Sequence, residues 1–175
     1  MGGLDDRAMR ILEIGRKHPE IRAESEEGTA GRIITARLRP GTDFLGGIKE
    51  LTKRHNILAG ALVVSFGSLA KAEISWKEGS KPDPSKKDER IRLEGPLSFL
   101  SSQGRVGITE DGEAIVHVHG VLIDLDGRCW GAHFYEGDNP VYSTFEIVIQ
   151  EIAGIRHTKV YDEECEVKLI KAVRL

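Results

Sequence analysis

The sequence has few cysteines and no long hydrophobic run, and these absences exclude several classes of protein. Its two cysteines, Cys129 and Cys165, lie far apart and form no Cys-x-x-Cys pair, so no disulfide framework is indicated. No apolar stretch reaches the roughly 18 residues that a transmembrane helix needs. The first ten residues, MGGLDDRAMR, include acids and lack the apolar region of a secretory signal. We therefore expect a cytoplasmic protein with no membrane partner.

An excess of positive charge is also missing. The formal net charge is -3, and the isoelectric point is about 6.1. Proteins that hold the phosphate backbone usually carry a basic face, because the release of counterions supplies most of their non-specific affinity. The charge balance therefore argues against non-specific nucleic-acid binding, and leaves only a local basic patch open.

The length and composition that remain are those of one globular domain. The chain has 175 residues, of which 39% are hydrophobic and 30% charged, which suffices for a core without stabilising cross-links. Residues 4–17 are predicted to form a helix, with apolar residues at helical spacing, acids near its start and bases at its end. A polar connector follows over residues 20–31. We expect residues 1–31 to form an N-terminal arm and residues 32–175 to form the domain.

One helix and many strands are predicted within the domain. Residues 43–55 carry apolar side chains at helical spacing, and Thr42 or Asp43 can cap the start of this helix. Apolar or alternating runs separated by turn residues predict strands over residues 32–38, 57–66, 69–76, 91–103, 105–109, 114–124, 128–135, 141–151 and 165–173. The charged residues 77–90 predict a solvated loop. The fold class expected is α+β, a mostly antiparallel sheet covered by one main helix.

Three histidines form the strongest candidate site. His117 and His119 lie two residues apart in a predicted strand, so both side chains point to one face, about 6–7 Å apart along the strand. His133 lies in the next strand, which a turn at Asp126-Gly127 would return antiparallel to the first. Three neutral imidazoles around one ion make a zinc-type site with a fourth position open. We predict that these histidines bind zinc or another divalent transition metal.

The other candidates are weaker. The three histidines could instead be structural residues that are hydrogen-bonded to neighbouring carbonyls. Asp124, Glu136 and Glu146 are candidates for an additional ligand or for a partner of the ligands. His157 is expected at the surface and has no assigned function. The motifs GxGxxG, GxxxxGK[ST] and GxSxG are absent, so the sequence identifies no catalytic residue.

Four segments of the sequence carry a resemblance to a known family. They are RLRPGTDFLGGIKELTKRHNI, AGALVVSFGSLAKAEI, GPLSFLSSQGRV and HVHGVLIDLDGRCWGAHFYEGDNPVYSTFEIVI. The most specific parts are the paired histidines and the run Gly131-x-His133-x-x-Glu136-Gly137. In order and spacing these segments resemble the plant and prokaryote conserved (PPC) domain family. The resemblance covers about residues 32–152 and does not extend to residues 1–31.

The resemblance implies a compact fold with antiparallel sheet, assembly into a homotrimer, and a metal centre at His117, His119 and His133. Prokaryotic members carry a DNA-binding label, whereas plant members carry the domain beside AT-hook motifs. This chain has no Arg-Gly-Arg flanked by prolines, so no motif supports the label here. Residues 95–100 also lack the Arg and Glu of the segment that plant members use to contact partners. Apolar residues on both faces of residues 57–66 and 141–149 independently favour oligomerisation.

Three hypotheses of function follow. The first is a homotrimeric metal-binding module with a regulatory or ligand-binding role, in which a small molecule or anion occupies the open metal position. The second is a metal-assisted hydrolase or lyase with Glu136 or Glu146 as the general base. The third is a DNA-binding protein. A cavity beside the histidines would keep the enzyme hypothesis open, and a dry core around them would exclude it.

Overall fold

The computed structural model describes residues 6–75 and 90–175, so most of the predicted loop over residues 77–90 lies outside the described residues. The described part contains two helices, α1 (Asp6–Lys17) and α2 (Phe44–Arg54). Its strands are β1 (Thr29–Leu38), β2 (Ala59–Ser75), β3 (Ile91–Ile108), β4 (Ala114–Ile123), β5 (Cys129–Phe134), β6 (Val141–Ala153), β7 (Ile155–Asp162) and β8 (Val167–Arg174). Neither described helix has the length and apolarity of a membrane span.

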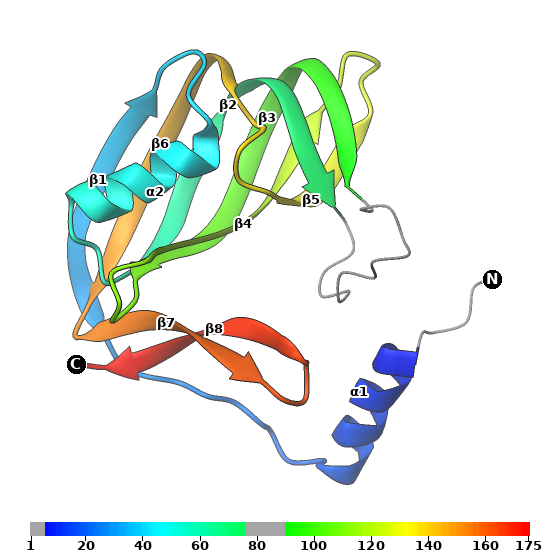
Figure 1. Cartoon of the computed structure of the whole chain (residues 1–175), viewed down its shortest axis with the longest axis vertical. Helices are drawn as coiled ribbons and strands as arrows, with labels where there is room; N and C mark the ends of the chain where they lie inside the picture. The colour runs from blue at the N-terminus through cyan, green and yellow to red at the C-terminus, as the bar shows by residue number, and fades with distance from the viewer. Residues whose placement is uncertain (1–5, 76–89) are drawn as a thin grey trace.

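The strands form one large sheet and one hairpin. The large sheet has the order β1-β6-β2-β3-β4-β5, and all of its pairings are antiparallel. The end of β2 also pairs with β5, which curls the β2–β5 half of the sheet back on itself. Within the described residues, strands β7 and β8 form a separate two-stranded sheet, and this hairpin lies across one end of the large sheet (Figure 1). The mostly antiparallel α+β architecture is as predicted.

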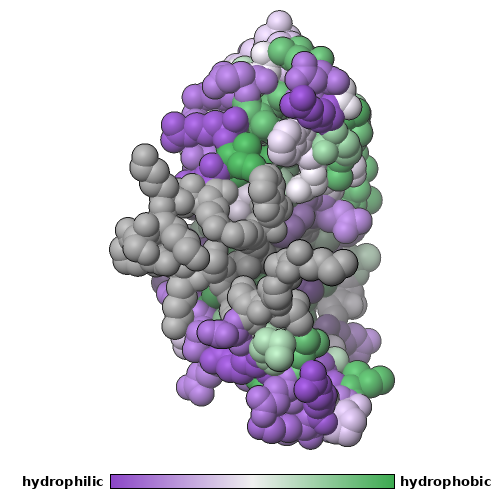
Figure 2. Space-filling view, turned by 90° about the vertical axis from the view of Figure 1, so that its right-hand side faces the viewer, coloured by the Kyte–Doolittle hydropathy of each residue, from purple (hydrophilic) through white to green (hydrophobic). Residues whose placement is uncertain are grey.

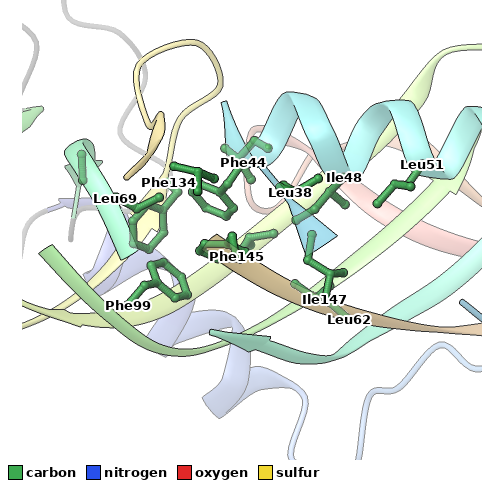
Figure 3. Close-up of a cluster of buried hydrophobic side chains, with 14 of the residues drawn as sticks. Leu38, Phe44, Ile48, Leu51, Leu62, Leu69, Phe99, Phe134, Phe145 and Ile147 are labelled. Carbon is green, nitrogen blue, oxygen red and sulfur yellow. The ribbon is translucent and has the colours of Figure 1, made fainter. Parts of the chain in front are cut away.

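The core lies between α2 and one face of the sheet, which we call the inner face (Figures 1 and 3). Asp43 caps α2, because its Oδ2 accepts a hydrogen bond of 2.8 Å from the backbone N–H of Gly46. Figure 3 shows phenylalanine side chains clustered at the start of the helix, one from the helix itself and the others from the strands below it. They are Phe44, Phe99, Phe134 and Phe145, with ring centroids 4.9–5.4 Å apart for the pairs in contact.

Two glycines that were predicted to separate strands instead lie inside long strands. The predicted pairs 57–66 and 69–76, and 91–103 and 105–109, are the single strands β2 and β3. A Cβ atom on Gly67 would lie 2.3 Å from the carbonyl oxygen of Thr144, and one on Gly104 would lie 2.4 Å from that of His117. Both glycines therefore allow a neighbouring strand to approach closely, rather than marking a turn.

Strand β7 was not predicted, and the expectation that His157 lies at the surface was wrong. His157 is 3% exposed, and its Nδ1 donates a hydrogen bond of 2.8 Å to the carbonyl oxygen of Val106. Burial, and secondarily the charge of Arg105, lowers the pKa of His157 below its ordinary value, whereas the hydrogen bond to Val106 opposes this shift. The histidine therefore anchors the β7–β8 hairpin to β3 as a neutral side chain.

The N-terminal segment is held to the hairpin by ion pairs. Arg10 of α1 lies 2.9 Å from Glu166, and Arg22 lies 2.7 Å from Glu164. The division into an arm of residues 1–31 and a domain of residues 32–175 stays a prediction. Both cysteines are free, in agreement with their spacing.

Replacing Phe44 by Ala is expected to lower the free energy of unfolding by about 3–5 kcal/mol, because the ring is fully buried and contacts three other aromatic rings. Urea unfolding would measure the change. Ile33→Ala serves as the control, since Ile33 is 69% exposed and its loss should change the stability by less than about 0.5 kcal/mol. Equal effects of the two substitutions would contradict this description of the core.

The ion pair between Arg32 and Glu151 is expected to make stability depend on pH. The Arg32 guanidinium donates hydrogen bonds to both carboxylate oxygens of Glu151 at 2.7 Å, and lowers the pKa of Glu151 to about 2. A lowered pKa in the folded state stabilises the fold above the ordinary pKa of 4.5 and loses that contribution as the pH falls toward 2. Glu151→Gln should therefore lower the urea midpoint at pH 7 but have a smaller effect at pH 3. A difference that is constant between these pH values would contradict the prediction.

Candidate metal centre

Strand β4 presents its histidines on the face of the sheet opposite the core, which we call the outer face. Val118, between the two histidines, is fully buried in the core on the inner face. His117 is half-buried and His119 is exposed. This is the alternation that the sequence predicted, and it places both imidazoles on one side of the sheet.

The pairing of β4 with its neighbours brings the third histidine alongside. His119 is the register partner of His133 in β5. The turn between these strands is built by Asp124, whose Oδ1 accepts hydrogen bonds from the backbone N–H groups of Asp126 at 3.0 Å and Arg128 at 2.8 Å. Gly127 completes the turn with a φ of 78°, a conformation that glycine adopts readily. The predicted hairpin is therefore present.

The nitrogen atoms of the three rings converge. Nε2 of His117 lies 2.8 Å from Nε2 of His119, and Nδ1 of His133 lies 3.4 Å from Nε2 of His119. One ring nitrogen from each histidine lies within 4.8 Å of the other two. Nitrogens bound to one tetrahedral zinc ion at about 2.0–2.1 Å are about 3.3 Å from each other. Small rotations of the side chains would therefore bring these three nitrogens to ligand positions.

Packing on both sides holds these rings in place. Behind β4, the core side of Gly120 touches Phe99, whose Cζ would lie 2.7 Å from a Cβ at this position. On the outer face, the ring of Tyr135 packs edge-on against His133, with centroids 4.9 Å apart. The guanidinium of Arg90 lies 4.1 Å from the centroid of Tyr135. The strand that carries the histidines thus cannot move without disturbing the aromatic core.

The structure does not bring the candidate carboxylates into this group. Asp124 accepts a hydrogen bond of 2.8 Å from Trp130 Nε1, which is the main cause of its lowered pKa, and it forms the turn described above. Glu136 pairs with Lys49 of α2 at 2.8 Å. Glu146 accepts a hydrogen bond of 3.0 Å from Thr144 in β6. Among the described residues, the only group of potential metal ligands is the three histidines.

A groove of about 800 Å³ lies directly beside the histidines. It is bounded by the outer face of β2, β3 and β4 and by strand β8, and its lining includes His117, His119, Gln103, Arg105 and Leu169. Arg105 is the register partner of His117, and Gln103 is the register partner of His119. No role for Arg105 or Gln103 was predicted from the sequence. An antiparallel pairing of β3 with β4, had it been predicted, would have placed both residues opposite the histidines. The strand was instead expected to end at Gly104, so this pairing was not considered.

Comparison with known proteins identifies relatives of this fold. The chain is 26% identical over 160 residues to the bifunctional protein GlmU of Synechococcus sp. strain JA-3-3Ab; the match covers 85% of the chain and 24% of that protein. The chain therefore spans about a quarter of the length of this relative.

Solved structures of similar fold cover most of the chain. A metal-containing protein of Archaeoglobus fulgidus has a TM-score of 0.70 and 21% identity, with 85% of this chain and 99% of the other covered. A PPC protein of Pyrococcus horikoshii has a TM-score of 0.67 and 22% identity, with coverages of 87% and 100%. A protein of Ralstonia eutropha, described as a candidate DNA-binding protein, has a TM-score of 0.64 and 18% identity, with coverages of 78% and 89%.

The family assignment rests on the sequence as well as on the shape. The model of the Plants and Prokaryotes Conserved (PCC) domain matches residues 25–153, which contain the whole six-stranded sheet, α2 and the three histidines. The chain therefore belongs to the PCC domain family, which is also abbreviated PPC.

Proposed function

We propose that this chain is a metal-binding module in which His117, His119 and His133 hold one divalent transition-metal ion. The observation that carries the proposal is the convergence of three imidazole nitrogens within 4.8 Å of one another on the outer face of the sheet. The distances from His119 Nε2 to the nitrogens of His117 and His133, 2.8 and 3.4 Å, are close to the spacing of ligands of a single ion. The description of the Archaeoglobus relative as metal-containing adds support.

The donor set favours a divalent transition metal, and zinc is the ion that we propose. Imidazole nitrogens suit zinc, copper, iron and nickel, whereas calcium and magnesium require oxygen ligands. The group contains no cysteine and no carboxylate, so thiolate-bound clusters and oxygen-bound ions do not fit it. When bound by these three imidazoles, the ion would supply Lewis-acid chemistry at the histidine cluster.

A role in binding or regulation fits the surroundings better than catalysis. A metal-assisted hydrolase or lyase requires a cavity beside the histidines, and the groove provides one. Such an enzyme also needs a general base near the metal-bound water. The two bases expected from the sequence, Glu136 and Glu146, have other partners and lie outside the histidine group. We therefore place the enzyme hypothesis second.

DNA binding has less support. The likeness to the Ralstonia protein rests on 18% identity, and its description does not extend to this chain. The net charge of -3 opposes the electrostatic attraction on which phosphate contacts depend.

We further propose that the chain assembles as a homotrimer through the part of its outer face that lies beyond the groove. Phe66, Leu100 and Val121 lie on the neighbouring strands β2, β3 and β4 and are 36–50% exposed. Figure 2 shows hydrophobic surface gathered on one side of the molecule, at the right of the view. Exposed apolar side chains on adjacent strands favour burial against another copy of the chain.

Protein purified without a histidine tag is expected to contain about one zinc ion per chain, measured by elemental analysis. The variant His119→Ala should lose this ion, because two imidazoles cannot hold zinc tightly. His18→Ala is the matched control, since His18 is exposed and lies outside the group. Removal of the metal by a chelator should lower the melting temperature, since free zinc at 100 times its Kd stabilises a fold by about 2.7 kcal/mol. A metal-free protein whose melting is unchanged by added zinc or by chelator would contradict the proposal.

The homotrimer predicts a mass of about 58 kDa by light scattering, three times the 19.3 kDa of one chain. Phe66→Glu should shift the protein toward the monomer, because it places a charge in the apolar contact. Leu125→Glu is the control, since Leu125 is equally apolar but lies in the β4–β5 turn and is 69% exposed. A monomeric parent protein, or a Phe66→Glu variant that remains trimeric, would refute this assembly.

A further inference from the structure

The groove beside the histidines combines one positive charge with an apolar wall. Among the described residues of its lining, Arg105 is the only cationic side chain apart from the imidazoles, and Ala61, Val63, Leu169 and Ile170 supply the apolar part. Val63 is 54% exposed and Leu169 is 40% exposed. These two side chains come from opposite walls, β2 of the large sheet and β8 of the hairpin.

Arg105 differs from most of the arginines described above in its surroundings. Arg10, Arg22 and Arg32 each pair with a glutamate at 2.7–2.9 Å. No hydrogen bond or ion pair joins the Arg105 side chain to a described residue, although the side chain lies close enough to His157 to lower its pKa. Because Arg105 is the register partner of His117, their side chains project from the same face, with Cβ atoms about 4.5–5.5 Å apart.

We infer that this groove binds a small monocarboxylate with an apolar chain. The planar fork of the Arg105 guanidinium matches a carboxylate, and Gln103, opposite His119, can donate a further hydrogen bond. Held by Arg105, the carboxylate would lie beside His117, and its chain would lie along Val63 and Leu169. This inference rests on the proposed metal function and names its ligand.

The charges and apolar residues of the groove favour a monocarboxylate over other oxyanions. A phosphate monoester carries nearly two negative charges at neutral pH and is usually held by several cations or by a helix N-terminus. The described lining provides one arginine, no lysine and no helix end. A monocarboxylate has one negative charge for Arg105 and an apolar chain for the apolar wall of the groove.

Titration calorimetry with the zinc-loaded protein tests the inference, with hexanoate as the probe. Hexanoate should bind more tightly than acetate, by about fourfold for each methylene that becomes buried. Hexanamide, which has no charge, and inorganic phosphate should bind more weakly than hexanoate. Arg105→Gln should weaken hexanoate binding about tenfold or more, while zinc content and melting temperature stay unchanged. Arg39→Gln is the control, since Arg39 is exposed and does not line the groove.

Outcomes for the ligand and for the metal can be separated. Equal affinity of the parent and Arg105→Gln for hexanoate would overturn the inference, as would binding of phosphate in preference to hexanoate. Absence of carboxylate binding by a zinc-loaded protein would also overturn it and leave the metal site standing. A protein that retains no zinc but still binds hexanoate through Arg105 would support the carboxylate site and contradict the metal proposal.

Discussion

Side chains on a β-strand alternate between two faces, so a shift of one residue in pairing would turn every side chain of β4 to the wrong side. The observed register sets Val118 against the core, and sets His117, His119 and their partners Arg105 and His133 on the outer face. This one alignment brings the three histidines together, places Arg105 beside them and leaves Val121 exposed on the same outer face. Because the inner face is filled by closely packed aromatic rings, a shifted register would bury imidazoles against Phe99 and expose Val118. The hydrophobic core thus fixes the geometry of a site that it does not touch.

The two faces of the sheet have separate roles. Helix α2 covers the inner face, and Phe44 at its start packs on the rings of Phe99, Phe134 and Phe145 (Figure 3). The outer face has no such helix within residues 6–75 and 90–175; its lower end meets the β7–β8 hairpin instead (Figure 1). His157 anchors that hairpin to β3 through the Val106 carbonyl. The hairpin in turn supplies Leu169 and Ile170 to the groove beside the histidines, which makes β7 and β8 part of the candidate binding site.

The sequence predicted those features that depend on local pattern. Local pattern limited the helix cap to Thr42 or Asp43, of which the structure uses Asp43. The helix after it, the alternation through AIVHVHGVLID and the turn at Asp126-Gly127 are likewise encoded within a few residues. Features that depend on distant residues were missed. Gly67 and Gly104 are indistinguishable from turn glycines until the strands that press against them, through Thr144 and His117, are in place. His157 similarly looked exposed because its partner, the carbonyl of Val106, lies 51 positions earlier in the chain. The roles proposed for Arg105 and Gln103 depend on the same long-range pairing.

Anomalous diffraction from crystals of the untagged protein, with data collected on both sides of the zinc absorption edge, would test directly whether the three histidines hold one zinc ion. We expect a single anomalous peak on the outer face, about 2.0–2.1 Å from one nitrogen each of His117, His119 and His133. The peak should be present above the edge and nearly absent below it. Three imidazoles that hydrogen-bond to carbonyls or to water, with no anomalous peak among them in crystals grown with zinc, would contradict it.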